Sequence, residues 1–283
     1  MNIANNYKKW FIISILIIAV GLVFALVNGL NIGIDFTGGT MIQFDLGKTV
    51  ELNEIASTIE EFDLNEEIIH AGDNNNEIII RTKKSLSNDE RVEISNKFKE
   101  KYDAEFLGAY QFSPSVGNEI KEKALVAILF ASLGMLVYIT FRFELIYGLA
   151  AIIALIHDVL VVLAIYAIFN IPVNSSFIAA ILTIVGYSIN DTIVVFDRVR
   201  ENVRRMKRED NFTIANVSIN QTILRSIFTS VTTLLVIGSL FVYGTPAVKE
   251  FATPLLAGVM AGTYSSIFIA SPIWAILKTN KAK

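Results

Sequence analysis

The chain alternates between long apolar runs and shorter polar segments. Six of the runs have the length of about 17–25 residues that an α-helix needs to cross a lipid bilayer. Apolar runs of this length that carry few or no charges are typical of membrane spans. The pattern therefore predicts six spans, at Trp10–Leu30, Ala124–Phe141, Leu145–Phe169, Val173–Phe196, Ser226–Tyr243 and Phe251–Leu277.

The segment between the first two spans is polar and long enough to form a domain. Its apolar positions alternate or recur at helical spacing, which predicts strand, helix, strand, strand, helix and strand in that order. Ser87 followed by Glu90 is a capping box that opens the second helix, which runs through Tyr102. This order is that of a ferredoxin-like α+β domain. The other predicted elements are Thr40–Leu46, Glu51–Phe62, Glu66–Ala71, Glu77–Thr82 and Ala104–Phe112.

The predicted fold class is a polytopic α-helical membrane protein with one extracytoplasmic α+β domain. Lys and Arg concentrate in the segments that join the spans on one side, whereas the short loops on the other side carry only Lys249. Because cytoplasmic loops are enriched in Lys and Arg, both chain ends are predicted to be cytoplasmic. The predicted regions are residues 1–30 (N-terminus and first span), 31–121 (outer domain) and 122–283 (five spans with the basic cytoplasmic segment 197–224).

Composition narrows the chemistry further. Hydrophobic residues make up 53% of the chain and charged residues 18%. There is no cysteine, which excludes disulfides, thiolate catalysis and cysteine metal sites. His70 and His157 are too far apart to indicate a metal site, and we expect His70 to be a packed or exposed strand residue. The basic segment lacks interleaved aromatic residues, so it indicates contact with anionic membrane lipid rather than nucleic acid.

Two polar pairs stand inside predicted spans. Asn190 and Asp191 lie in the fourth span, where an Asp near the bilayer centre costs about 2.5–3.5 kcal/mol on insertion scales. A chain that tolerates this cost usually gains a proton site, an ion site or a tight contact between helices. His157 and Asp158 fall near the middle of the third span. For this second pair two interpretations stay open, namely hydrogen bonds that join helices and a relay.

The fifth span opens with a cation followed by hydroxyl side chains. Arg225, Thr229, Thr232 and Thr233 share one helical face. The fourth span ends and the fifth begins on the same side of the membrane, so Arg225 can reach the depth of Asp191. Movement of the guanidinium would change the proton affinity of the carboxylate, which is a sufficient switch. The alternative is a static ion pair in which Arg225 extends towards water.

Glycines mark a turn after the first span and a packing face in the last. The first group suits a backbone that turns sharply and then enters a strand. A structural turn is at least as well supported as a ligand loop, because the Gly-Lys-Ser/Thr ending of a phosphate loop is absent. Gly258, Gly262, Ser265 and Ser266 predict close helix packing rather than chemistry. The motif residues after the first span are Gly33, Asp35, Gly38 and Gly39.

Five segments together resemble one family of membrane proteins. They are Gly33–Gly39, His157–Val159, Gly186–Thr192, Asp197–Asn202 and Arg225–Ser230. In combination they are similar to SecF-type members of the SecD/SecF family, which are protein-export membrane proteins of the RND superfamily. The resemblance covers nearly the whole chain and implies a six-helix RND-type transmembrane bundle.

The resemblance implies a proton-coupled transport subunit rather than an enzyme, with no catalytic residue, cofactor or metal. It implies a heterodimer with SecD in the bacterial cytoplasmic membrane, associated with the SecYEG channel and YajC, that uses the proton-motive force to draw exported polypeptides across. The coupling ion is expected to be H⁺, with Na⁺ as an open alternative. By motif match, the coupling residues are Asp191 and Arg225, and candidate relay or interhelical residues are Asn190, His157, Asp158 and Thr229.

Two other functions compete with this one. A proton-coupled RND-type small-molecule exporter would also have buried carboxylates, but such pumps carry twelve spans in one chain, so this chain would be one half. An intramembrane aspartyl protease would use Asp158 and Asp191 as a catalytic pair. The Gly-x-Gly-Asp context of that class is absent, and the two estimated depths differ, so protein export is the favoured interpretation.

Overall fold

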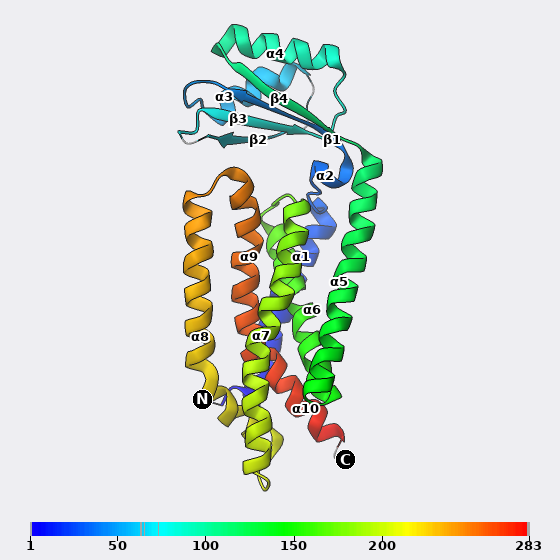
Figure 1. The fold of residues 1–283 in the computed structure, drawn as a ribbon, viewed down its shortest axis with the longest axis vertical. Helices are drawn as coiled ribbons and strands as arrows, with labels where there is room; N and C mark the ends of the chain where they lie inside the picture. Colours follow the sequence, from blue (N-terminus) through cyan, green and yellow to red (C-terminus); the bar gives the residue numbers. More distant parts are fainter. Residues whose placement is uncertain (1, 63, 65, 73, 282–283) are drawn as a thin grey trace.

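The computed structural model describes residues 2–62, 64, 66–72 and 74–281, and it is elongated, with an α+β domain at one end of a helical bundle (Figure 1). In this part of the chain, six helical segments are long and apolar enough to cross a membrane. The residues near both chain ends lie at the end of the bundle away from the α+β domain (Figure 1). The predicted fold class, with six spans and one outer domain, is confirmed.

Most of the spans are longer than the apolar runs that predict them, and α6 ends one residue short of its run. α5 begins at Pro114, a favourable first position for a helix, so the predicted boundary at residue 121 falls inside a helix. The basic segment 197–224 is mostly helical, because α7 continues inward past Phe196 and α8 begins well before Arg225. The helices of the bundle are α1 (Tyr7–Asn28, after a short 3₁₀ turn at Ala4–Asn6), α5 (Pro114–Arg142), α6 (Leu145–Ile168), α7 (Ser175–Arg205), α8 (Asn211–Tyr243), α9 (Pro246–Ser265), the π turn η3 (Ser266–Ala270) and α10 (Ser271–Lys281).

The outer domain has the predicted order of elements. Its four strands form one antiparallel sheet with strand order β2-β3-β1-β4, which is the ferredoxin-like arrangement. The predicted bounds of β2 and β3 are confirmed, and the others differ by a residue or a few. The elements are β1 (Gly39–Asp45), α3 (Leu52–Ile59, followed by a 3₁₀ turn at Glu60–Phe62), β2 (Glu66–Ala71), β3 (Glu77–Thr82), α4 (Asn88–Tyr102) and β4 (Glu105–Phe112).

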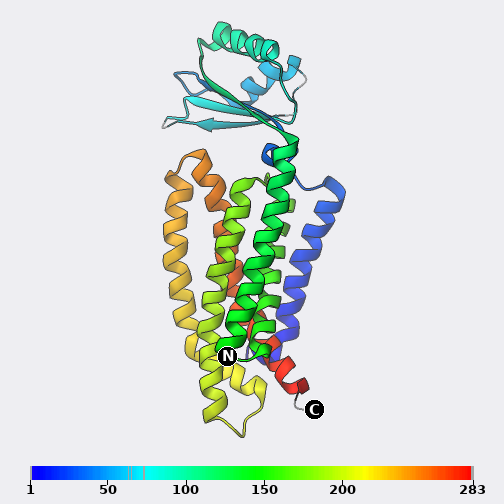
Figure 2. The same ribbon diagram turned by 45° about the vertical axis from the view of Figure 1, so that its right-hand side comes forward.

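One face of the sheet packs on α3 and α4, and the other face looks towards the bundle (Figures 1 and 2). Alternation along β1 buries Ile42 and Phe44 on the helix side, where Phe44 stacks on Phe98 of α4 with ring centroids 4.5 Å apart. The predicted capping box is present, since the Ser87 N–H donates to Glu90 Oε2 at 2.8 Å and the Glu90 N–H donates to Ser87 Oγ at 3.3 Å. The alternate positions face the bundle, and they include Arg81 of β3 and its cross-strand neighbour Glu67 of β2.

Within the bundle, α7 and α9 pack against each other most closely. A Cβ added to Gly258 would lie 2.1 Å from Ile184 Cδ1, and one added to Gly262 would lie 2.9 Å from the Ser188 Cβ. Only glycine permits this approach, so the predicted packing face of the sixth span is confirmed. These two helices form the buried centre of the bundle, whereas α1, α5 and α8 present apolar side chains outward.

Candidate functional site: two buried carboxylate clusters

Asp191 lies on the buried side of α7, where three helices meet. Its side chain is 4% exposed. Asp191 Oδ1 accepts a hydrogen bond from Thr229 Oγ1 of α8 at 3.3 Å, and Oδ2 accepts one from Ser230 Oγ at 3.4 Å. Ser230 Oγ also shares a hydrogen bond with Thr263 Oγ1 of α9. The carboxylate is thus surrounded by hydroxyl groups and is held by long, weak hydrogen bonds.

Arg225 lies one turn before Thr229 on α8. The Thr229 hydroxyl lies within hydrogen-bond distance of the Arg225 and Ser226 carbonyl oxygens, at 3.0 and 2.9 Å, as well as of Asp191 Oδ1. Its single hydrogen can therefore be donated either to its own helix or to the carboxylate. The Arg225 side chain is exposed, and the ion pairs among the described residues do not include one with Asp191. The static ion pair is therefore not formed in this structure, and the joint role of Arg225 and Asp191 stays a prediction.

Asp158 forms a second, tighter cluster on α6. It is fully buried, and its Oδ2 accepts hydrogen bonds from Ser188 Oγ of α7 at 2.6 Å and Ser265 Oγ of α9 at 2.9 Å. His157 Nδ1 lies 3.0 Å from Asp158 Oδ1, and its Nε2 lies 2.9 Å from Ser14 Oγ of α1. The interhelical hydrogen bonds expected of this pair are present, whereas a relay role stays a prediction.

The two clusters are neighbours along α7. Asp191 lies three residues beyond Ser188, a rise of about 4.5 Å along the axis. Thr192 Oγ1 donates to the Ser188 carbonyl at 3.1 Å and shares a hydrogen bond of 2.8 Å with Ser266 Oγ of the π turn. Ser265 and Ser266 are fully buried at this helix contact, and both hydroxyls also form hydrogen bonds between helices, which the sequence does not predict.

Several members of the clusters carry no individual signal in the sequence. A serine or threonine at membrane depth bonds readily to its own helix, so nothing in the pattern separates the hydroxyls that reach a carboxylate from the others. Their position three or four residues from a buried acid, or on a facing helix, is the only available indication. Asn190 is exposed on α7, and none of the described hydrogen bonds involves its side chain. The members that the sequence did not single out are Ser14, Ser188, Ser230 and Thr263.

The glycine motif at residues 33–39, where the chain enters the outer domain, forms hydrogen bonds to the start of α7. The Gly33 N–H donates to the Val173 carbonyl at 2.8 Å, and Asp35 Oδ2 accepts from the Ser175 N–H at 2.8 Å. The motif continues as the short helix α2 (Ile34–Thr37) and then turns through Gly38 at φ 80°. A Cβ on Gly39, at φ 146°, would lie 2.2 Å from the Thr82 carbonyl oxygen. These contacts support the turn interpretation of the motif.

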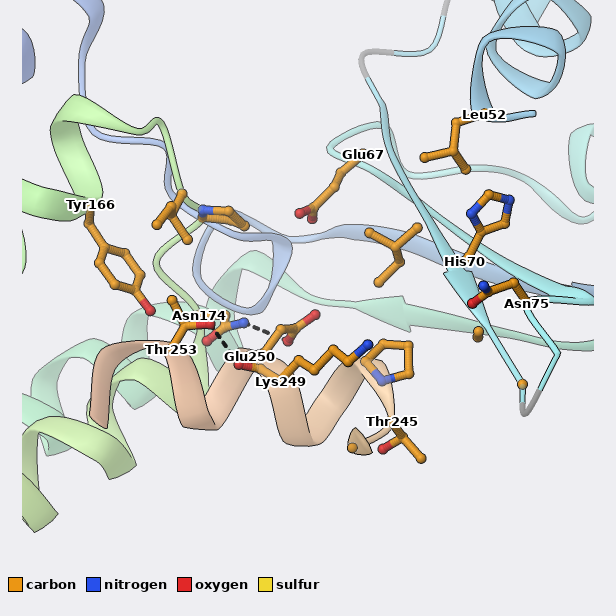
Figure 3. Close-up of a pocket in the computed structure, with 17 residues that line it drawn as sticks. Leu52, Glu67, His70, Asn75, Tyr166, Asn174, Thr245, Lys249, Glu250 and Thr253 are labelled. Atoms are coloured by element: carbon orange, nitrogen blue, oxygen red, sulfur yellow. Dashed lines mark hydrogen bonds between the residues drawn. The ribbon is translucent and has the colours of Figure 1, made fainter. Parts of the chain in front are cut away.

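A cavity of about 390 Å³ lies between the outer domain and the bundle, and its lining includes no residue of either carboxylate cluster (Figure 3). Glu67 and His70 of β2 line one side, and Asn174, Lys249 and Glu250 line the other. His70 Nε2 lies 2.6 Å from the Val50 carbonyl oxygen, so this side chain is packed, as expected. Among the described residues, no group of three or more His, Cys, Asp or Glu side chains is arranged to hold a metal ion.

Comparison with known proteins shows to which family the chain belongs. The family model described as "Protein export membrane protein SecD/SecF, C-terminal" matches residues 92–280, and that of the SecD/SecF GG motif matches residues 23–50. The chain belongs to the SecD/SecF family. Its members include the protein translocase subunit SecF of Calditerrivibrio nitroreducens, 38% identical over 98% of this chain and 93% of the relative. That of Haemophilus influenzae is 37% identical over 94% and 82%.

Solved structures of the SecD/SecF family share the fold. SecDF from Thermus thermophilus, described as a translocon-associated membrane protein, superposes with a TM-score of 0.87 at 33% identity over 99% of this chain. SecDF in a super-membrane-facing form gives a TM-score of 0.76 at 32% identity over 100% of this chain. The chain spans 39% of the length of each of these SecDF chains.

Proposed function

We propose that this protein is a SecF-type subunit of the Sec protein-export translocase that works with SecD and uses the proton-motive force to promote the movement of polypeptides across the bacterial cytoplasmic membrane. In this proposal Asp191 binds and releases the coupling proton, and Arg225 responds to its charge. Both chain ends are cytoplasmic, and the α+β domain lies outside, where an exported chain emerges from the SecYEG channel. YajC is a further expected partner.

The observation that carries the proposal is the environment of Asp191. The carboxylate lies at membrane depth, is almost fully buried and contacts only hydroxyl groups, with no cation among its described contacts. A nearby cation stabilises the charged form of a buried carboxylate, whereas burial without a cation favours the neutral form. Approach or withdrawal of Arg225, one helical turn from Thr229, would therefore change the proton affinity. One charge moved through 100 mV supplies about 2.3 kcal/mol, enough to drive such a change.

The proposal predicts that Asp191→Asn removes the gradient-dependent part of export. Membrane vesicles that contain the chain with SecD and SecYEG would be given a preprotein, and export would be measured with and without an uncoupler. In wild-type vesicles the uncoupler slows export, whereas Asp191→Asn vesicles export at the uncoupled rate under both conditions. The amide keeps the shape and the hydroxyl contacts but cannot lose a proton in this range, so the change isolates protonation.

Thr183→Ala is the matched control, because Thr183 is exposed on the same helix and its described hydrogen bond is to the carbonyl of Ala179 in its own helix. It should retain the uncoupler-sensitive fraction of export. An Asp191→Asn variant that inserts normally, retains SecD and still exports at the full gradient-dependent rate would contradict the proposal.

A further inference from the structure

An ionic cluster joins the outer domain to the bundle at one corner of the cavity. Arg81 lies on the bundle-facing side of β3, and its Nη1 is 2.5 Å from Glu250 Oε1 of α9 and 3.5 Å from Glu67 Oε2 of β2. The Arg81 and Glu250 side chains are 16% and 21% exposed. A pair that is shielded to this degree is stronger than a surface ion pair, because solvent screens it less.

The same cluster reaches the outer end of α7. Glu250 Oε2 accepts a hydrogen bond from Asn174 Nδ2 at 2.7 Å (Figure 3). Asn174 is also the N-cap of α7, where its Oδ1 accepts from the Phe177 N–H at 3.0 Å. With Asp35 accepting from the next amide, at Ser175, the outer domain is fastened to the first turns of both α7 and α9.

These two helices are the ones that carry the carboxylate clusters. α7 supplies Asp191 and Ser188, and α9 supplies Ser265 and Thr263. The glycine contacts between α7 and α9 leave no room for the pair to slide without repacking. A change at Asp191 that moves either helix would therefore also move the end of that helix near the outer domain, where Arg81 contacts Glu250.

The Arg81 contact is able to separate and re-form. Burial opposes the charge of Arg81, but the carboxylates of Glu250, Glu67 and Asp35 outweigh it and hold the Arg81 pKa above its usual value. The guanidinium of arginine is intrinsically basic enough to stay charged when the pair separates as well. The cavity of about 390 Å³ beside Glu250 and Glu67 offers space in which water can solvate the separated charges.

We infer that Arg81 and Glu250 form a releasable contact that positions the outer domain over α7 and α9 and transmits changes at Asp191 to that domain. The transmitting part of the inference rests on the proposed function. The positioning part concerns the two parts of this chain alone and is tested separately.

The absence of native cysteine permits a direct test in full-length protein in membranes. Ile69, which lines the cavity, is replaced by Cys, and the rate of its modification by a membrane-impermeant maleimide is measured. Arg81→Gln in this background should raise the rate by about tenfold or more, the effect expected when a charge-assisted hydrogen bond is lost. An Asn96→Cys variant, exposed on α4 away from the cavity, is the control and should react at the same rate with either residue at position 81.

Charge reversal keeps the test independent of folding defects. Arg81→Glu alone should open the cavity, and the double variant Arg81→Glu with Glu250→Arg should return the Ile69→Cys modification rate to within about twofold of the starting value, because the pair is restored. An unchanged modification rate in Arg81→Gln, or a double variant as open as the single one, would overturn the positioning role.

Export measurements test transmission. Arg81→Gln should keep the uncoupler-insensitive rate and lose most of the uncoupler-sensitive part, and the charge-reversed double variant should regain it. An Arg81→Gln variant whose cavity is open but whose gradient-dependent export is normal would overturn transmission while leaving the proposed function intact. Failure of the proposed function itself is recognised separately, as normal gradient-dependent export in Asp191→Asn.

Discussion

The two buried carboxylates are held in different ways. Asp158 accepts short hydrogen bonds of 2.6 and 2.9 Å from two serines and has an imidazole nitrogen at 3.0 Å. Asp191 has only hydroxyl contacts of 3.3 and 3.4 Å. The first arrangement favours one fixed position, because two serine hydroxyls donate to the same oxygen and would lose this acceptor if the carboxylate moved. The second leaves the carboxylate free to change state, which suits the role proposed for Asp191.

The hydrogen bonds to Asp158 should contribute measurably to stability. Ser188→Ala removes a hydroxyl donor to a buried carboxylate, and such bonds contribute about 1.5–3 kcal/mol. We expect a lower midpoint of thermal unfolding in detergent. Ser239→Ala is the control, because that hydroxyl is exposed and bonds to its own helix at Val236, so its loss should leave the midpoint nearly unchanged.

Among individual residues, the sequence predicts the buried acids better than the side chains that contact them. Asp191 and Asp158 stand out because a charge in an apolar run is rare and costly. Ser188 and Ser230 do not, because a hydroxyl in a span can bond to its own helix, and its facing partner is set by helix rotation. The position of Arg225 is likewise set by side-chain conformation, so sequence predicts its depth but not whether the pair with Asp191 is formed.

Among the helices, the pairing of α7 and α9 is the most constrained. Gly258→Ala would place a Cβ 2.1 Å from the end of Ile184, so the helices must separate or Ile184 must move. Overpacking of this kind typically costs about 1–3 kcal/mol. The prediction is a lower unfolding midpoint, measured in detergent, and a loss in the double variant Gly258→Ala with Ile184→Ala that is smaller than the sum of the two single losses, because the shortened side chain makes room for the new methyl group.

Gly186→Ala on α7 provides the contrast, because a Cβ there meets nothing within 4 Å. It should leave the midpoint unchanged or raise it slightly, since alanine favours the helix over glycine. Equal destabilisation by the two glycine replacements would contradict the role of the close contact at Gly258.

The start of α4 should respond to acid. Hydrogen bonds from the Ser87 N–H and contact with Lys84 lower the Glu90 pKa to about 2 from an ordinary value of 4.5. A lowered pKa stabilises the folded helix above the ordinary value, and this stabilisation is lost as the pH falls from about 4.5 towards 2. Hydrogen exchange of the first-turn amides should therefore be faster in Glu90→Ala than in wild type at pH 6, and the difference should shrink by pH 3.

Glu93→Ala, an exposed acid on the same helix, should change exchange little at either pH. A difference between wild type and Glu90→Ala that is as large at pH 3 as at pH 6 would contradict the role of the ionised carboxylate.

The sequence predicts which helices and strands form. It predicts the ends of some elements of the outer domain but not the ends of most membrane helices. The turn sequence at residues 72–76 between two strand-like runs and the Ser87–Glu90 box predict β2, β3 and α4 almost to the residue, because both patterns mark the residues at the ends. Apolar runs end where the bilayer ends, whereas a helix continues into water wherever its residues permit. For this reason α5 begins at Pro114, and α7 continues to Arg205, outside the runs that predict them.

The whole molecule has one outer domain, one bundle and a wide outward-facing apolar surface on α1, α5 and α8. Membrane lipid and a partner are expected to share this surface. In the solved SecDF structure, nearly all of this chain corresponds to only 39% of the SecDF chain, so the rest of that chain is the part that a partner would supply. The side of the membrane on which the outer domain lies follows from Lys and Arg counts alone and is a prediction.

Vesicles of known orientation would test that prediction. Single cysteines at Asn96 of the outer domain and at Lys207, between α7 and α8, should react with an impermeant maleimide from opposite sides. In right-side-out vesicles only Asn96→Cys should be modified before lysis, and in inverted vesicles only Lys207→Cys. The reverse pattern would place the chain ends outside.

The π turn at Ser266–Ala270 contains about one residue more than an α turn. Beyond it Trp274 and Ala275 are fully buried, and Lys278 pairs with Glu144 at 2.8 Å. A residue lost from the regular helix would rotate everything after it by about 100° around the axis and would break these contacts. The widened turn already holds the extra residue, so loss of one residue there converts it to an α turn and leaves the faces of the helix on either side in place. Single-residue deletions should therefore be better tolerated within this turn than in the regular helix on either side of it.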